Sequence, residues 1–294
     1  MNQMSICGGV ARSVLVLIAA SMTAVAQNPR VEWNAPQAPF RVFGNTYYVG
    51  PRGVSSILIT SGSGHVLIDG ALPESVPGIV ASIQRLGFRI EDVDLILNSH
   101  VHYDHAGGIG ELLRLSGARA AASAASARVL EQGRSGPDDP QYGVLPDIAR
   151  VGQVQVVSDG QAVRVGPLEL TAHATGGHTP GGTSWTWTSC QGARCLDMVY
   201  ADSLTAISAD GFAFTRSRES PTALADFEKG FAFLSAAPCD ILLTPHPGTS
   251  DLLERLAKRE NGETDALIDT AACRRYAERG REGLRRRIEV EEKK

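Results

Sequence analysis

The sequence has little aromatic content, no excess of basic residues and, beyond its first segment, no long apolar run. Phe, Trp and Tyr make up 6% of the 294 residues, and the formal net charge is −4. Nucleic-acid binding through phosphates needs a basic surface, which this composition does not offer. The arginine-rich run over 274–294 is interrupted by glutamates and predicts a solvated helix. After residue 26, no segment has the ~20 consecutive apolar residues of a membrane helix.

The first 26 residues have the features of a secretory signal peptide. Arg12 precedes the apolar run over 14–20, and Ala24, Val25 and Ala26 form an A-x-A cleavage pattern before Gln27. The apolar run is too short to span a bilayer. We therefore expect cleavage after residue 26, one domain over 27–294 and a periplasmic location without a membrane anchor.

Only five cysteines are present, and Cys7 lies in the predicted signal peptide. The other four, Cys190, Cys195, Cys239 and Cys273, form an even set in an oxidising compartment, which favours two disulfides. Cys190 with Cys195 would close a hairpin and contribute roughly 2 kcal/mol, whereas Cys239 with Cys273 would contribute roughly 4 kcal/mol. Zinc thiolates are the weaker alternative, because none of the four shares a short motif with a histidine.

Apolar periodicity and glycine spacing predict strands and helices in two similar halves. The first half has strands over 40–49, 55–60, 65–69 and 93–97 and helices over 73–86, 110–115 and 124–130. The second has strands over 154–157, 162–165, 168–174, 183–188, 196–201 and 241–244, and helices over 222–234, 250–258 and 265–287. This order predicts an α+β fold, an αββα sandwich of four layers. The Gly- and Pro-rich segment 133–143 is predicted to be a flexible loop beside a pocket.

Potential metal ligands are concentrated directly after the strand over 93–97. His100, His102, Asp104 and His105 occupy six positions, and three of the seven histidines of the chain are among them. Imidazole and carboxylate groups are good zinc ligands. If the segment stays extended, His100, His102 and Asp104 project to one side and His105 to another. Two directions indicate two metals.

Two further histidines follow strands in rigid turns. His178 lies in the glycine-rich turn 175–182, and His246 lies between two prolines. A pair of metals needs about six protein ligands, and these two histidines complete the set sensibly. His65 and His173 lie within strand patterns and are left out.

These motifs, together with the run 201–205, resemble the metallo-β-lactamases, specifically their B3 subclass. The narrower resemblance depends on Ser203, where the other subclasses carry a cysteine ligand, and on His105. It implies that one zinc is held by His100, His102 and His178 and the other by Asp104, His105 and His246. It also implies that Ser203 and Thr205 dock the substrate carboxylate. Gly177 stands where the family usually has proline, and Tyr103 where phenylalanine is commoner.

The resemblance implies hydrolysis of the β-lactam amide of penicillins, cephalosporins and carbapenems, and hence antibiotic resistance. In the mechanism we expect, two zinc ions provide a hydroxide at neutral pH, and Asp104 orients it. Gln141 is expected to face the pocket from the loop 133–143. The expected partner is a small β-lactam substrate, and the expected state is a monomer.

Three alternatives remain at this point. A glyoxalase II-like thioesterase or a lactonase of the same fold would use Asp202 to bridge both metals, whereas the resemblance places Asp202 behind the ligands. A serine hydrolase would use Ser203, but no G-x-S-x-G turn surrounds it. A secreted zinc carrier would bind metal without turnover.

Overall fold

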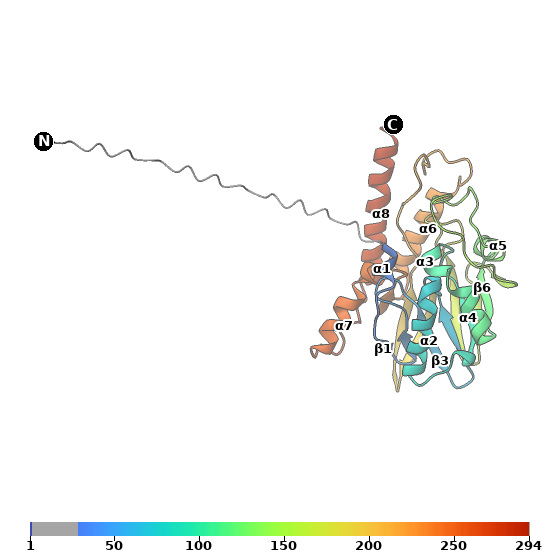
Figure 1. Cartoon of the computed structure of the whole chain (residues 1–294), viewed down its shortest axis with the longest axis vertical. Helices are drawn as coiled ribbons and strands as arrows, with labels where there is room; N and C mark the ends of the chain where they lie inside the picture. Colours follow the sequence, from blue (N-terminus) through green and yellow to red (C-terminus); the bar gives the residue numbers. More distant parts are fainter. Residues whose placement is uncertain (2–28, 294) are drawn as a thin grey trace.

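The computed structural model describes Met1 and residues 29–293. The predicted signal peptide over 1–26 therefore lies outside the described residues except for Met1. Two mixed sheets face each other, and helices lie on their outer faces (Figure 1). This arrangement confirms the predicted αββα sandwich of four layers.

The first sheet has seven strands in the order in which they occur along the chain. The strands are β1 (Phe40–Phe43), β2 (Thr46–Tyr48), β3 (Ile57–Ser61), β4 (Gly64–Ile68), β5 (Val93–Leu97), β6 (Arg119–Ser123) and β7 (Val154–Val157). The pairs from β1 to β4 are antiparallel, and the pairs from β4 to β7 are parallel. The single strand predicted over 40–49 is two strands, because the chain turns at Gly44 with a φ of 51°.

The second sheet has five described strands in the order β12-β11-β10-β9-β8. They are β8 (Ala162–Val165), β9 (Leu168–Ala174), β10 (Thr183–Gln191), β11 (Arg194–Tyr200) and β12 (Ile241–Leu243). The strand over 154–157, which the sequence analysis grouped with the second half, was expected in this sheet, and that expectation was wrong. A crossover through a helix brings β7 parallel to β6 in the first sheet, with Ala120 opposite Val154, and such a long connection is what parallel pairing requires.

The helices are mostly where the sequence predicted them. They are α1 (Pro29–Trp33), α2 (Val76–Arg85), α3 (Tyr103–Ala106), α4 (Ile109–Ser116), α5 (Ala124–Gln132), α6 (Ala223–Ala236), α7 (Leu252–Glu260) and α8 (Ala272–Glu291), with short 3-10 turns η1 (Pro73–Ser75), η2 (Ile90–Asp92) and η3 (Pro247–Ser250). None of the helices in the described part combines the length and apolarity needed to cross a membrane. The helix predicted over 265–287 begins later, because the Asp269 carboxylate accepts a hydrogen bond from the Ala271 N–H and forms a turn before α8.

Three clusters of buried apolar side chains correspond to the three contacts between the four layers. The middle cluster fills the space between the sheets and includes Ile57, Leu95 and Trp185. A second cluster packs α2, α4 and α5 on the first sheet. The third, around Phe227 and Phe231, packs α6 and α8 on the second sheet. Burial of apolar side chains in these layers is the main favourable contribution to folding.

The loops that follow β5, β9, β11 and β12 meet at one edge of the sandwich. A backbone hydrogen bond from Thr183 N–H to Ser99 O at 2.8 Å joins the start of β10 to the loop after β5, and one from Ser55 N–H to Pro245 O at 2.7 Å joins the β2–β3 loop to the loop after β12. Each of the loops after β5, β9, β11 and β12 carries a residue that the sequence analysis singled out. The predicted meeting of loops from both halves is therefore present.

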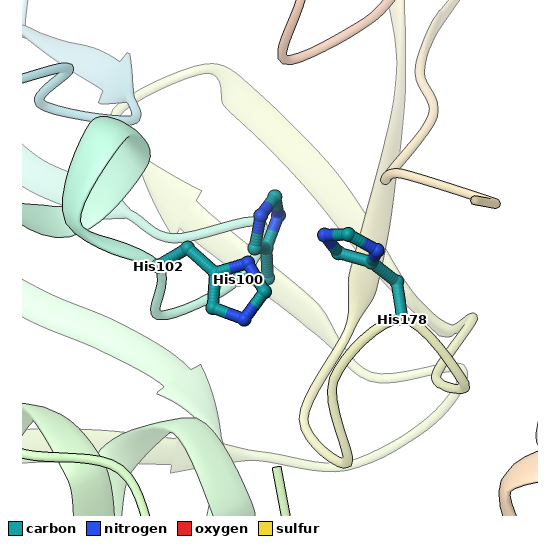
Figure 2. A group of neighbouring side chains, drawn as sticks. All are labelled: His100, His102 and His178. Carbon is teal, nitrogen blue, oxygen red and sulfur yellow. The ribbon is translucent and has the colours of Figure 1, made fainter. Parts of the chain in front are cut away.

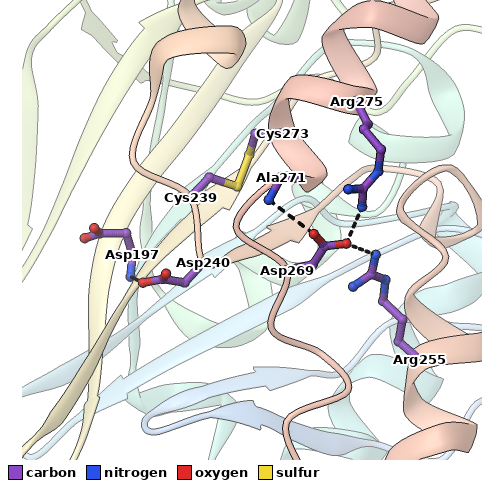
Figure 3. Close-up of a disulfide and its surroundings, with 8 residues drawn as sticks. All are labelled: Asp197, Cys239, Asp240, Arg255, Asp269, Ala271, Cys273 and Arg275. Carbon is purple, nitrogen blue, oxygen red and sulfur yellow. Dashed lines mark hydrogen bonds and ion pairs between the residues drawn. A yellow bond between two sulfur atoms is a disulfide. The ribbon is translucent and has the colours of Figure 1, made fainter.

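Both predicted disulfides are present. Cys190–Cys195 closes the β10–β11 hairpin, where the two residues are opposite one another. Cys239–Cys273 connects the loop before β12 to the first turn of α8 (Figure 3). The zinc-thiolate alternative is wrong, because all four sulfur atoms are in these bonds.

We expect the two disulfides to differ in their contribution to stability. The chain-entropy model gives about 4 kcal/mol for the bond that spans 34 residues and about 2 kcal/mol for the one that spans 5. Cys239→Ser/Cys273→Ser should therefore lower the free energy of unfolding more than Cys190→Ser/Cys195→Ser. Urea denaturation of both double variants measures the difference, and the reverse order would contradict it.

Asp269 is the acidic centre of a small ion-pair cluster beside the second disulfide (Figure 3). Its carboxylate lies between the guanidinium groups of Arg255 and Arg275. Burial opposes ionisation of Asp269, but hydrogen bonds from the two arginines lower its pKa to about 2. The cluster connects α7 with the start of α8.

We expect the Asp269 cluster to contribute stability that is lost in acid. Because the folded pKa of about 2 lies below the unfolded value of ~3.9, the contribution is complete above pH ~4 and disappears as pH falls toward 2. Asp269→Asn should lower the free energy of unfolding by about 1–2 kcal/mol at pH 7, and by less below pH 4. Denaturation at both pH values measures this. Asp265→Asn, which loses only an exposed pair with Arg194, should have little effect.

Candidate metal centre

The loop that carries the first ligands is held in place by a buried acid, Asp69. This residue follows β4 with a φ of 60°, and its carboxylate accepts hydrogen bonds from Ser99 N–H at 2.7 Å, Ser99 Oγ at 2.6 Å and Tyr200 Oη at 2.7 Å. Asn98 adds a hydrogen bond from Nδ2 to the carbonyl of His100 at 2.7 Å. Burial raises the pKa of Asp69, whereas its electrostatic interaction with His105 and the donors from Ser99 lower it.

The ligand loop does not stay extended. The chain turns into α3, with the Ala106 N–H donating to His102 O at 2.8 Å. Asp104 therefore lies beside His105 and His246, and the expectation that it projects with His100 and His102 was wrong. The structure nevertheless forms two groups of three ligands, as two directions of projection indicated.

The first group consists of His100, His102 and His178 (Figure 2). One nitrogen from each ring lies within 4.8 Å of the others, and all three side chains are buried. His178 reaches the group from the β9–β10 turn, opposite the two histidines of the loop after β5 (Figure 2). This is a spacing at which three imidazoles can hold one ion.

Each ring of the first group is oriented by a hydrogen bond on its outer nitrogen. His100 Nδ1 lies 2.7 Å from Asp202 Oδ1, and His178 Nδ1 lies 2.8 Å from Thr205 O. The opposite nitrogen of His100, Nε2, is buried and has no hydrogen-bond partner in the described part of the chain. A buried nitrogen that faces two other imidazoles is well suited to a metal, so the residues fit the ion that the donor set implies.

The second group consists of Asp104, His105 and His246. Asp104 Oδ2 lies 3.0 Å from His105 Nε2 and 3.2 Å from His246 Nε2, while His246 Nδ1 faces Gly53 O at 3.0 Å. The two groups are adjacent, because the ring centroids of His100 and His105 are 4.3 Å apart. Together they can hold a pair of ions.

Burial and neighbouring charges give His100, His178 and Asp104 the protonation states that metal binding needs. Burial lowers the pKa of His178 to about 3 and that of His100 well below its ordinary value, and the neighbouring histidines add to both effects. Burial opposes ionisation of Asp104, but His105 and His246 hold its pKa well below the usual range. For His246, burial opposes protonation, but the contact with Asp104 raises its pKa, so an ion must displace a proton from this ring. Neutral imidazoles and an ionised carboxylate are the forms that coordinate a metal.

The other residues singled out from the sequence lie around the two groups. Ser203 is buried in the segment that follows β11, and Thr205 is exposed with its Oγ1 3.2 Å from His178 Nδ1. Gln141 Nε2 lies 3.4 Å from His102 Nδ1 and lines a cavity of about 330 Å³ with His102 and Tyr103. The segment 133–143 therefore borders a pocket, as predicted.

Two departures from the family pattern have clear structural settings. Gly177 adopts a φ of 116°, which proline cannot adopt, and a Cβ there would lie 2.5 Å from the Phe227 ring. The hydroxyl of Tyr103 lies 2.6 Å from Arg30 and donates to Glu74 at 3.2 Å, which connects α1 with α3. The hydroxyl thus holds the N-terminal segment against the helix that carries two ligands.

Sequence reasoning missed two acids that support the ligands. Asp69 follows β4 directly and precedes Gly70, and that strand-end position was a usable signal. Asp139, whose Oδ1 lies 3.2 Å from His102 Nε2, is in an irregular loop without a motif. Nothing in the local sequence distinguishes it from Asp138.

Comparison with known proteins identifies the family. A model of the metallo-beta-lactamase superfamily matches residues 49–268. The Rm3 metallo-β-lactamase structure is 56% identical, covers 90% of this chain and 98% of its own, and has a TM-score of 0.88. MEM-A1, a subclass B3 metallo-β-lactamase from a soil metagenome library, is 50% identical over 88% of this chain and 98% of its own, with a TM-score of 0.86.

A third solved structure, the metallo-β-lactamase SMB-1 bound to 2-mercaptoethanesulfonate, is 41% identical over 88% of this chain and 99% of its own, with a TM-score of 0.85. The uncharacterized protein YobT of Bacillus subtilis (strain 168) is 28% identical over 145 residues. The matched region is 48% of this chain and 59% of the length of YobT. The chain belongs to the metallo-β-lactamase superfamily. Within it, the chain is a metallo-β-lactamase of the B3 type.

We expect removal of the Asp69 carboxylate to release the ligand loop. Asp69→Ala leaves buried donors of Ser99 and Tyr200 without an acceptor, which should lower the free energy of unfolding by about 3 kcal/mol or more. Tyr200→Phe removes one donor and should cost about 1 kcal/mol. Denaturation with a chelator present measures both without any contribution from metal. A loss below 1 kcal/mol for Asp69→Ala would contradict the role.

Proposed function

We propose that this enzyme binds two zinc ions and hydrolyses the β-lactam amide bond of penicillins, cephalosporins and carbapenems, and thereby confers antibiotic resistance. The observation that carries the proposal is the juxtaposition of two complete ligand triplets, with His100 and His105 in ring contact. Imidazole and carboxylate donors suit zinc. The disulfides fit an oxidising compartment, and we place the mature enzyme in the periplasm as a monomer.

His100, His102 and His178 would hold one zinc, and Asp104, His105 and His246 the other. When bound, the two ions would supply Lewis acidity: they would polarise the amide carbonyl and lower the pKa of water, so that hydroxide is available as the nucleophile at neutral pH. The chain itself fixes the rings through outer partners such as Asp202 and the Thr205 carbonyl. The nucleophile is therefore water, and no side chain needs to form a covalent intermediate.

Asp104 is the acid–base residue of the proposal. Its neighbours His105 and His246 keep it ionised, so its carboxylate can accept a hydrogen bond from the attacking water and orient it. Substrate carboxylates would dock on two hydroxyl donors, Ser203 and Thr205, and Gln141 would contact the substrate from beside His102. None of these three is a cation, so recognition depends on hydrogen bonds and tolerates varied substrates.

The thioesterase and lactonase alternatives require Asp202 to reach both metals. Asp202 instead faces His100 Nδ1, and neither ligand triplet of the described residues includes it. Its side chain is fully buried, and burial raises its pKa well above the ordinary value. This geometry supports a role behind the ligands, as in the β-lactamase hypothesis.

A substrate panel tests the reaction. Purified mature enzyme should hydrolyse nitrocefin and meropenem but not a glutathione thioester or a homoserine lactone. Because the proposed reaction depends on the Lewis acidity of the zinc ions, removal of zinc by dipicolinate should abolish the activity, and added zinc should restore it. Activity that survives complete zinc removal would contradict the proposal, and preferential thioester or lactone hydrolysis would favour the alternative.

Substitution of Asp104 tests the role of the acid. Asp104→Ala should lower kcat by about 10²–10⁴-fold, because both water orientation and a ligand of the second ion are lost. Zinc content measured by mass spectrometry should fall from two to one per chain. Asp210→Asn, an exposed acid in the loop after β11, is the matched control and should leave both values unchanged. Near-normal kcat in a zinc-replete assay of Asp104→Ala would remove Asp104 from the mechanism.

A further inference from the structure

Asp139 is a buried acid with no role in the function described so far. It lies in the loop between α5 and β7 and is 3% exposed. Its Oδ2 accepts a hydrogen bond from Ser135 Oγ at 2.9 Å, and its Oδ1 accepts one from Gln141 N–H at 2.8 Å. The same Oδ1 lies 3.2 Å from His102 Nε2. The carboxylate thus connects the loop with a histidine of the first triplet.

This contact selects which nitrogen of His102 faces the triplet. His100 and His178 are both held by Nδ1, which leaves Nε2 for a metal. His102 is held by Nε2 at 3.2 Å, so Nδ1, which also lies 3.4 Å from Gln141 Nε2, is the nitrogen that can face the metal. An imidazole that is not held by a hydrogen bond can flip, so that either nitrogen faces the metal. A carboxylate hydrogen-bonded to one nitrogen fixes both the tautomer and the ring orientation.

The loop that carries Asp139 is anchored on its other side as well. The Ala209 N–H donates to Pro140 O at 2.8 Å, which connects this loop to the segment after β11. That segment also supplies the Thr205 carbonyl that holds His178. Two loops far apart in sequence therefore meet behind the first triplet and each orients one of its rings.

We propose that Asp139 is a positioning residue that orients His102 for the first metal and attaches the loop 133–143 to the site. The inference depends on the proposed metal assignment but not on the substrate. By the same attachment, Asp139 places Gln141, two residues later, with its Nε2 3.4 Å from His102 Nδ1. Loss of Asp139 should therefore weaken metal binding and loosen the loop together.

Zinc competition against a chromophoric chelator measures the first effect. Asp139→Ala should bind the first zinc about 10–100-fold more weakly than the wild type, which is the usual loss when the outer partner of a ligating histidine is removed. Asp139→Asn keeps an acceptor for His102, so its zinc affinity should lie between that of the wild type and that of Asp139→Ala. Asp138→Asn is the matched control. Among the interactions described, the Asp138 carboxylate contacts only the exposed Arg128, so this variant should bind zinc normally.

Hydrogen exchange of the metal-free enzyme measures the second effect. In Asp139→Ala, backbone amides over 135–143 should exchange about tenfold faster than in the wild type, whereas Asp138→Asn should not change them. If Asp139→Ala bound zinc normally and exchanged normally, the proposal would be overturned. β-lactam turnover enters neither measurement, so failure of the proposed reaction would be distinguished from failure of this inference.

A reciprocal variant covers the case in which Asp139→Ala does not fold. His102→Ala, studied without metal, removes the other partner of the contact. The amides over 135–143 should again exchange about tenfold faster. Unchanged exchange in this variant would show that the loop is held without His102 and would overturn the proposal.

Discussion

The hydrogen-bonded carboxylate of Asp69 is the interaction on which the rest of the site depends. It follows β4 of the first sheet, it receives a hydrogen bond from Tyr200 of the second sheet, and it holds Ser99, the residue before the first ligand. One buried acid thus connects both sheets and the ligand loop. Its burial is costly, and three good donors offset that cost. The sandwich and the site are for this reason one structural unit.

From that point outward, four of the six ligands are each held by a partner from another part of the chain, the Thr205 carbonyl at His178 among them. Asp202 holds His100, Asp139 holds His102 and the Gly53 carbonyl holds His246. Burial, and secondarily the neighbouring imidazoles, lower the pKa of His100 and His178. These two rings are therefore prepared as neutral ligands.

Most strands and helices were predictable, because their apolar residues repeat with the period of a strand or a helix. The errors have specific causes. β7 lies in the first sheet because a crossover returns it beside β6, and a local pattern does not reveal which sheet a strand joins. The start of α8 is shifted by the turn at Asp269, and α3 turned Asp104 away from the side on which an extended chain would have placed it.

The types of ligand, their order along the chain and the two disulfide pairs were determined by the sequence itself, since residue chemistry and spacing carry that information locally. The tertiary structure alone decided which ring nitrogen of His102 faces inward, and it alone revealed Asp69 behind the ligand loop and Asp139 behind His102. These features arise from contacts between residues far apart in the chain, such as Asp69 with Tyr200 and His100 with Asp202. Such contacts leave no periodic pattern, because only folding brings the partners within hydrogen-bond distance.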